Sequence, residues 1–384
     1  MTTHLVRAGR VVCPLSGIDA PGQVVVRGSR IVAVETGTDC RTEAGHELLD
    51  FPDGILLPGL IDLHAHPANA NSVFGVPPNE HMLPQGVTTV MSQGDAGADN
   101  VDDYVERTVR SSRTRVLLAI NLSRVGESTE RGCFENPDDA DVSACVDAVV
   151  RHPEVVRAIA VNASHHACGS TNPREMLRRG LQVAEETELP LLYGMRRPEN
   201  WPLAEQLELL RPGDIVTYCF RREPHRIVQN GRVLDCVQEA RRRGVLFDVG
   251  HGTASFSFDV AEAAIRDGVP PDTISTDLQA RHLQLSPPHS LPLVMSKLLA
   301  AGMPESDIFR AVTATPAQLL GLTDSIGCLQ PGASADLVVL KRLPTEQLQD
   351  AHGQSRSGYV WAVERVFCGD TVAECHGKER DTAS

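Results

Sequence analysis

Two histidines one residue apart are the first residues in this sequence whose types and spacing suggest chemistry. His64 and His66 stand at the end of an apolar run, within "GLIDLHAHP" at residues 59–67. Residues i and i+2 of a β-strand point to the same face, so the two imidazoles would lie side by side. Such a pair supplies half of a transition-metal site, and the other half has to come from elsewhere in the chain.

Eight apolar runs divide the middle of the chain, and helical patterns separate most of them. The runs are 59–66, 87–92, 114–122, 156–162, 189–195, 214–220, 245–251 and 273–278. Alternation of strand and helix repeated eight times predicts an α/β fold, a (β/α)8 TIM barrel over residues 59–320. In this fold active sites lie at the C-terminal ends of the strands, which is where the two histidines fall.

Both ends of the chain are rich in β-strand patterns. Stretches such as "GQVVVRG" near the N-terminus and "ASADLVVLKR" near the C-terminus alternate or run β-branched between glycines and prolines. We therefore expect residues 1–58 plus 321–384 to form one small β-sandwich domain beside the barrel.

A third metal ligand is expected at the end of the eighth run. Asp277 lies there, and the first and eighth strands are neighbours when a barrel closes, so His64, His66 and Asp277 should converge. Three protein ligands plus water make a catalytic metal site. A metal there would polarise a carbonyl and lower the pKa of its water toward ~7, and Asp277 would carry the water's proton to a leaving group.

Other strand ends supply residues that could surround a substrate. His251 stands between two glycines after the seventh run and is the second catalytic candidate. The substrate-binding candidates are Asn162, His165, His166, Tyr193 and Tyr218. Each has a structural alternative, because tyrosines and asparagines can simply fill a barrel mouth and loop histidines can be solvated. The H-x-H pair alone could likewise be two hydrogen-bonded histidines.

The charge, apolar runs and cysteines of the sequence indicate which binding partners and which compartment to expect. A formal net charge of −14 argues against nucleic acid, because phosphate binding needs a basic face. No apolar run approaches the ~20 residues that span a membrane, and the start "MTTHLVRAGRVV" lacks the pattern of a signal peptide. Ten scattered cysteines without a C-x-x-C pair predict reduced thiols in a cytoplasmic protein. A small-molecule substrate is the expected partner, and the oligomeric state stays open, a homo-oligomer included.

Several long stretches resemble the amidohydrolase superfamily, in its dihydroorotase-like branch of amidohydrolase/deacetylase metallohydrolases. They are "LPGLIDLHAHP", "GVTTVMSQGDAGADN", "SRTRVLLAINLSRVG", "GVLFDVGHGTASFSF", "ISTDLQ" and "MSKLLAAGM". The resemblance covers nearly the whole chain, including the β-rich ends. It implies a barrel with a split β domain and a metal-dependent hydrolase.

The sequence departs from that branch at the second metal position. Typical members add a carboxylated lysine on strand four and one histidine on each of strands five and six. Ala160, Gly194 and Tyr218 stand at the corresponding positions here. Only three lysines occur, with Lys297 on a helix after strand eight and Lys341 and Lys378 toward the C-terminus, so none is expected to substitute.

The resemblance therefore implies one divalent metal ion, zinc, held by the remaining ligands. The expected activity is hydrolysis of an amide, a cyclic amide, or an acetyl ester or amide in a small polar metabolite. Two alternatives stay open. One is a metal-poor or metal-free enzyme with changed chemistry, such as a cyclase, isomerase or lyase. The other is a ligand-binding relative without catalysis.

Overall fold

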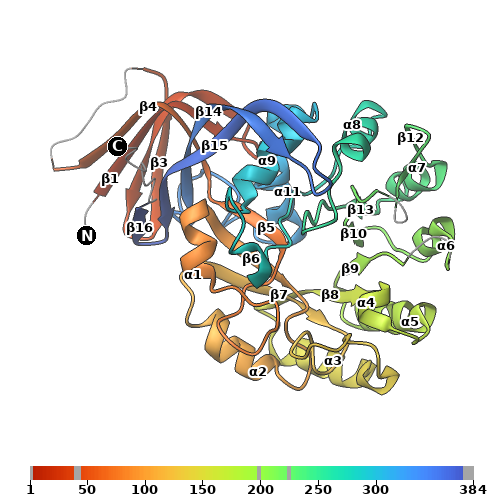
Figure 1. The fold of residues 1–384 in the computed structure, drawn as a ribbon. Helices are drawn as coiled ribbons and strands as arrows, with labels where there is room; N and C mark the ends of the chain where they lie inside the picture. The colour runs from red at the N-terminus through yellow and green to blue at the C-terminus, as the bar shows by residue number, and fades with distance from the viewer. Residues whose placement is uncertain (1–2, 39–44, 197–199, 223–225, 375–384) are drawn as a thin grey trace, which may run out of the picture.

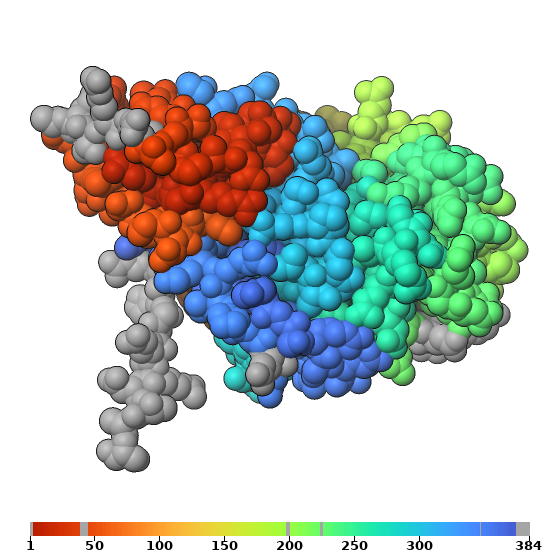
Figure 2. Space-filling model, turned by 90° about the horizontal axis from the view of Figure 1, so that it is seen from above, coloured from red at the N-terminus to blue at the C-terminus, as the bar shows by residue number. Residues whose placement is uncertain are grey.

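A computed structural model describes residues 3–38, 45–196, 200–222 and 226–374 of the 384-residue chain. It has two parts, a barrel with helices around it and a β domain that contains both ends of the chain (Figure 1). From above, the N-terminal strands lie against C-terminal segments on one side of the molecule (Figure 2). No helix among the described residues has the length and apolar character needed to cross a membrane.

The barrel is built on seven parallel strands that follow one another in chain order around the sheet. They are β5 (Leu60–Ala65), β6 (Val87–Gln93), β7 (Arg115–Asn121), β8 (Val156–Asn162), β9 (Leu191–Gly194), β10 (Ile215–Thr217) and β13 (Leu246–Phe247). Side chains alternate between the two faces of these strands. Ile61, Leu63 and Leu192, for example, fill the barrel interior.

The eighth run closes the barrel without forming a regular strand. Its only bridge among the described residues joins Asp248 to Thr273. Backbone N–H groups of Val249 and His251 bond to this segment on one side, and the N–H of Asp277 bonds to the carbonyl of His64 at 2.7 Å on the other. Asp277 has a φ of +51°, which a strand does not accommodate. The prediction of an eighth regular strand is thus wrong, whereas the TIM-like arrangement is confirmed.

Helices and short turns cover the outside of the barrel. The helices are α1 (Pro78–His81), α2 (Val101–Tyr104, continued by a π-helical turn at Val105–Val109), α3 (Val142–Arg151), α4 (His165–Cys168), α5 (Pro173–Glu186), α6 (Leu203–Glu208), α7 (Asp235–Arg242), α8 (Phe258–Arg266), α9 (Leu291–Ala300), α10 (Glu305–Ala311) and α11 (Ala314–Leu319). The 3-10 turns are Leu83–Gln85, Pro137–Asp139 and Ala280–His282. Sequence signals fix several of these starts. At α5, for instance, the side chain of Asn172 caps the helix and Pro173 occupies its first turn.

The β domain is one mixed seven-stranded sheet made from both chain ends, which confirms that prediction. Its strands are β1 (Thr3–Cys13), β2 (Ile18–Arg27), β3 (Arg30–Thr36), β4 (Glu47–Pro58), β14 (Leu337–Gln349), β15 (Ser355–Cys368) and β16 (Thr371–Glu374), in the order β16-β15-β14-β4-β1-β2-β3. The antiparallel pair β4–β14 joins the two ends of the chain. A separate two-stranded ribbon, β11 (Val228–Gln229) and β12 (Arg232–Val233), lies on the barrel side. The domain boundaries at residues 58 and 320 stay a prediction.

Candidate metal centre

The predicted metal ligands converge at the C-terminal end of the barrel. His64 lies near the end of β5 and His66 directly follows the strand, and both are buried. The Nε2 atoms of the two rings lie 3.5 Å and 3.3 Å from Oδ1 of Asp277. One ligand atom from each of the three residues lies within 4.8 Å of the others. The period of the strand and the closure of the barrel therefore bring together the three residues that the sequence singled out.

The opposite nitrogen of each ring is held by a polar group behind it. Nδ1 of His64 lies 2.7 Å from Oγ1 of Thr217, and that hydroxyl donates to Asp248 at 2.8 Å. Because the threonine proton goes to Asp248, the hydroxyl oxygen accepts from Nδ1–H. Nδ1 of His66 lies 3.0 Å from the carboxylate of Asp95 and donates to it. Both rings are thus held in the tautomer that presents the Nε2 lone pair to Asp277.

The charges around the rings favour a cation at this point. Burial opposes protonation of His64, but the carboxylates of Asp248 and Asp277 raise the pKa of its ring to about 9. The pKa of His66 is likewise raised well above its usual value, against the effect of burial, by Asp95 and Asp277. The two imidazoles in turn hold the pKa of the buried Asp277 carboxyl well below its usual range.

These features fit a bound divalent cation. The Nε2 atom of His64 is buried and has no hydrogen-bond partner among the described residues. Two imidazole nitrogens and one ionised carboxylate form a donor set that suits a transition metal and leaves room for water. His64, His66 and Asp277 are therefore the residues that would hold such an ion.

Three aligned positions, Ala160, Gly194 and Tyr218, lie within the barrel or at its mouth. Ala160 is buried in the barrel interior. A side chain at Gly194 would meet Oδ1 of Asn162 at 2.8 Å, so Asn162 occupies that space. The ring of Tyr218 lies 4.9 Å from the ring of His64, with a backbone φ of +64°. Asn162 and Tyr218 thus lie near the strand ends, and their role in substrate binding stays a prediction.

His165 and His166 begin the short helix α4, which Ser164 caps. The ring of Phe74 lies 5.3 Å from the ring of His66 and 6.3 Å from the ring of His166. The group of potential metal ligands around Asp277 does not include His165 or His166. Their role as substrate contacts stays a prediction.

Tyr193 does not reach the mouth. Leu192 points into the barrel, so its neighbour in β9 points outward, into the layer between strands and helices. The Tyr193 hydroxyl donates to Oε1 of Gln206 at 2.8 Å, and the residue is fully buried. The prediction that Tyr193 lines the site is therefore wrong, because alternation along β9 directs its side chain away from the barrel interior.

His251 faces a second cavity through its side chain. Its Nδ1–H donates to the carbonyl of Gly252 at 2.8 Å, and its Nε2 accepts from Nζ of Lys297 at 2.9 Å. The ring stacks on Phe256 at 4.9 Å. Burial, and then the charge of Lys297, lower the pKa of His251 well below its usual value, so the ring is neutral. The catalytic role of His251 stays a prediction. Lys297, which the sequence placed on a helix after strand eight, contacts this strand-end histidine directly.

Sequence reasoning missed most of the polar groups behind the ligands. They are Asp95, Glu127, Thr217 and Asp248, and the contact of Lys297 with His251 was missed as well. The Gly-Asp pair in "SQGDAG" at the exit of β6 was a usable signal for Asp95. Glu127 gave none, because it lies in a loop. Its carboxylate is 3.5 Å from Nδ1 of His66, and burial raises its pKa to about 7.

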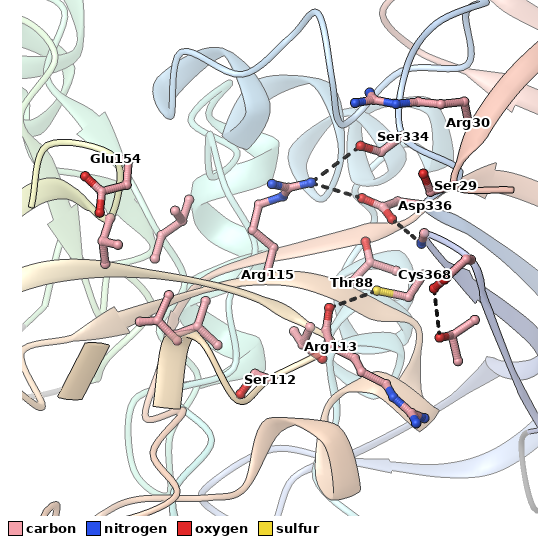
Figure 3. A pocket seen from close by; sticks show the side chains of 18 residues that line it. Ser29, Arg30, Thr88, Ser112, Arg113, Arg115, Glu154, Ser334, Asp336 and Cys368 are labelled. Carbon is pink, nitrogen blue, oxygen red and sulfur yellow. Dashed lines mark hydrogen bonds and ion pairs between the residues drawn. The ribbon is translucent and has the colours of Figure 1, made fainter. Parts of the chain in front are cut away.

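A different cavity, of about 700 Å³, is lined by residues at the starts of barrel strands, such as Thr88 in β6 and Arg115 in β7 (Figure 3). It opens between the N-terminal end of β7 and the β domain. Arg115 projects into it, 3.8 Å from the carboxylate of Asp336 and 3.4 Å from the hydroxyl of Ser334. In this fold the N-terminal face of the strands serves stability, so this cavity does not compete with the metal centre as the site of catalysis.

Known proteins share both the sequence and this architecture. Residues 213–368 match the model of the amidohydrolase family. The chain is 31% identical over 341 residues to a deacetylase of Agrobacterium fabrum, covering 88% of this chain and 81% of that protein. It is 30% identical over 344 residues to a deacetylase of Enterococcus faecalis, covering 88% and 90%.

Solved structures agree with these relatives in fold. A dihydroorotase superposes with a TM-score of 0.87 at 28% identity, over 97% of this chain and 99% of that one. An adenine deaminase superposes with a TM-score of 0.87 at 26% identity, over 97% and 100%. Sequence identity of about 30% over most of the chain establishes that these deacetylases are relatives of this protein. The histidine-aspartate centre at the barrel mouth agrees with that relationship. The chain belongs to the amidohydrolase superfamily, in the branch that contains deacetylases and dihydroorotase-like proteins.

Proposed function

We propose that this protein is a metal-dependent deacetylase that hydrolyses an acetyl amide or ester of a small polar molecule. The observation that carries the proposal is the convergence of His64, His66 and Asp277, with each imidazole fixed so that its Nε2 faces the carboxylate. The deacetylases among its relatives support the acetyl group as the part removed. We further propose a single divalent ion, zinc, as the cofactor.

The residues of the centre have distinct tasks in such a reaction. A bound metal ion supplies Lewis acidity and lowers the pKa of a water toward ~7. Asp277 is ionised, and its Oδ1 accepts a hydrogen bond from Nε2 of Gln279 at 2.7 Å, which fixes the orientation of the carboxylate. In the proposed reaction it accepts the proton of the attacking water and passes it to the leaving group.

Tyr218 is suited to donate a hydrogen bond to the oxygen of the reacting carbonyl. Burial, and then the charge of Asp277, raise the pKa of the Tyr218 hydroxyl well above its usual value. The hydroxyl therefore keeps its proton at neutral pH. A protonated phenol beside His64 can donate a hydrogen bond to the oxyanion that forms when water attacks the carbonyl.

Metal stoichiometry tests the proposal first. A two-metal site holds its ions ~3.5–4 Å apart, and a shared anionic ligand opposes their repulsion. Ala160 cannot supply that ligand. We expect elemental analysis after desalting to find no more than one tightly bound divalent ion per chain, and much less in His64→Asn. The control is His152→Asn, because His152 pairs with Asp102 on the outer surface. Two retained equivalents would contradict the single-ion site.

Activity distinguishes the chemical class. Acetate release from N-acetyl amino acids and O-acetyl hydroxy acids should be abolished by chelation, restored by zinc, and absent in His64→Asn but not in His152→Asn. Ring opening of cyclic amides without any acetate release would instead favour a dihydroorotase-like reaction. Acetate release that survives both chelation and His64→Asn would refute the role of the metal.

A further inference from the structure

A second cavity adjoins the closing segment of the barrel, on the side of α9 and the β domain. Its volume is about 650 Å³. Polar and ionisable side chains contributed by barrel loops, α9 and β14 surround it: His251, His289, Lys297, Gln347, Gln349 and Asp350. The metal-binding proposal uses none of these groups.

Lys297 is the unusual member of this set. It is 5% exposed, and its Nζ donates to Nε2 of His251 at 2.9 Å. His251 uses its other nitrogen to donate to the Gly252 carbonyl, so it is a neutral partner. An ammonium has three N–H donors. In the described part of the chain, no carboxylate oxygen lies within 4.0 Å of Nζ, and two donors have no acceptor.

The carboxylate that lines the same cavity is already occupied. Asp350 accepts hydrogen bonds from the backbone N–H groups of Phe258 at 3.1 Å, His352 at 2.8 Å and Gln354 at 2.9 Å. These bonds hold it against the chain, where it shapes the turn after β14. Asp350 therefore does not act as the direct counter-ion of Lys297.

A buried ammonium that no carboxylate contacts directly is costly, by several kcal/mol, even with the charge of Asp350 nearby. A ligand carboxylate would neutralise the charge and offer two acceptor oxygens to the two remaining donors. We propose that this cavity binds a small carboxylate, with the Lys297 ammonium as its charge partner and His251 fixing the position of that ammonium.

Hydrogen bonds to the backbone of residues 275–276 connect the proposed carboxylate site to the metal centre. His289 donates from Nε2 to the carbonyl of Thr276 at 2.8 Å, and the N–H of His251 donates to the carbonyl of Ser275. Both contacts are made to the segment that carries Asp277. The carboxylate can belong to the substrate itself or to a separate molecule, and the site does not require the deacetylase proposal to be right.

Calorimetry with two probes of the same shape tests the site. Lactate carries a carboxylate, whereas lactamide carries a neutral amide in its place. We expect the purified holoprotein to bind lactate at least ~10-fold more tightly than lactamide. The Lys297→Met substitution keeps the length of the side chain and should weaken lactate binding by a similar factor. Lys341→Met is the matched control, because Lys341 lies on β14, pairs with Glu364 and does not line the cavity, so it should not affect lactate binding.

Several results would overturn the proposal. Equal affinity for lactate and lactamide would do so with the natural sequence alone, even if Lys297→Met failed to fold. Lactate binding that survives Lys297→Met but disappears after chelation would assign the anion to the metal instead. Inhibition experiments distinguish a carboxylate of the substrate from a separate carboxylate ligand, and either result supports the proposed binding site. Competitive inhibition by lactate, with KM raised in Lys297→Met, identifies a substrate carboxylate, and binding unaffected by substrate identifies a separate ligand.

Discussion

The orientation of each metal-facing histidine depends on a polar group on the side of the ring away from Asp277. His64 relies on the Thr217 hydroxyl and His66 on the Asp95 carboxylate. Asp95 is itself held by the hydroxyls of Ser72 and Ser92, each at 2.5 Å. Partners of this kind fix the tautomer and raise the basicity of the ligand.

Replacing Asp95 should therefore weaken the metal site without removing a ligand. We expect Asp95→Asn to lower metal affinity ~10–100-fold, because His66 loses the negative charge behind it. Competition with a chromophoric chelator measures the affinity. Asp99→Asn is the control, since Asp99 is half exposed and pairs with Arg124. Equal affinity of natural protein and Asp95→Asn would show that His66 does not need this carboxylate.

Lys297 should leave a signature in the pH dependence of stability. Burial lowers its pKa from 10.5 to about 8 in the folded protein. Below about pH 8 the folded state bears the whole penalty of the buried charge, and the penalty is lost as pH rises to 10.5, where the lysine is neutral in both states. Between these limits the unfolded chain binds more protons, so stability rises with pH.

The size of this effect follows from the shift. A difference of about 2.5 in pKa corresponds to about 3 kcal/mol, as an order of magnitude. Urea unfolding across this pH range should show the natural protein gaining roughly that much relative to Lys297→Met. Parallel curves for the two proteins would mean that the ammonium is better solvated than its burial indicates.

At the scale of elements, the loop after β13 packs closely against Asp277 because it has a glycine, Gly252, at the point of contact. Gly252 has a φ of +48°, and a side chain there would lie 2.4 Å from Oδ2 of Asp277. The sequence showed two glycines around His251 but not which neighbour they accommodate. The glycine keeps the loop in contact with the third ligand.

Gly252→Ala should accordingly damage the metal centre more than the fold. The added carbon displaces the Asp277 carboxylate, so we expect metal affinity and turnover to fall at least ~10-fold. Gly268→Ala is a matched control, with a φ of +77° and open space around the new carbon. It bears the same kind of backbone strain, ~1–2 kcal/mol, with no contact to the site. Similar metal affinity in both variants would assign the glycine to backbone conformation alone.

Periodic patterns in the sequence predicted the barrel strands and the residues at their ends. They did not predict local geometry that depends on the conformation of a single residue. Spacing alone placed His64 and His66 on one face, and barrel closure placed Asp277 beside them. It did not predict the left-handed backbone at Asp277 and Tyr218, because such conformations depend on tertiary contacts. It also missed Glu127, whose loop has no periodic pattern. Loops after barrel strands carry specificity for the same reason that they resist prediction.

At the scale of the whole molecule, the two ends of the chain meet in one sheet, which lies beside the barrel. β4 runs directly into the first barrel strand, and β14 returns after the last helix to pair with β4. β15 then packs on α9, beside which it lies in Figure 1. The β-rich composition of both ends predicted the shared sheet, but not this packing, because pairing between distant segments has no local signal.

Trp361 on β15 tests whether the β domain and the barrel unfold together. Its side chain is 3% exposed, its ring lies 5.6 Å from that of Phe309 in α10, and its backbone N–H donates to the hydroxyl of Ser296 in α9. Removing a buried tryptophan costs about 3–5 kcal/mol. Because the described helices belong to the barrel, helical circular dichroism reports on the barrel and not on the substituted sheet.

We therefore expect Trp361→Ala to shift the urea transition of the helical signal to lower concentration, as a single step. The control is Tyr359→Ala, two residues earlier on the same strand, where the side chain is 46% exposed and contacts Arg342. It should change stability by less than ~1 kcal/mol. If Trp361→Ala left the helical transition in place, the barrel would be stable without its contact to the β domain. A single shifted transition would instead mean that the chain ends stabilise the strands carrying His64 and His66, so the metal centre would be lost in the same step.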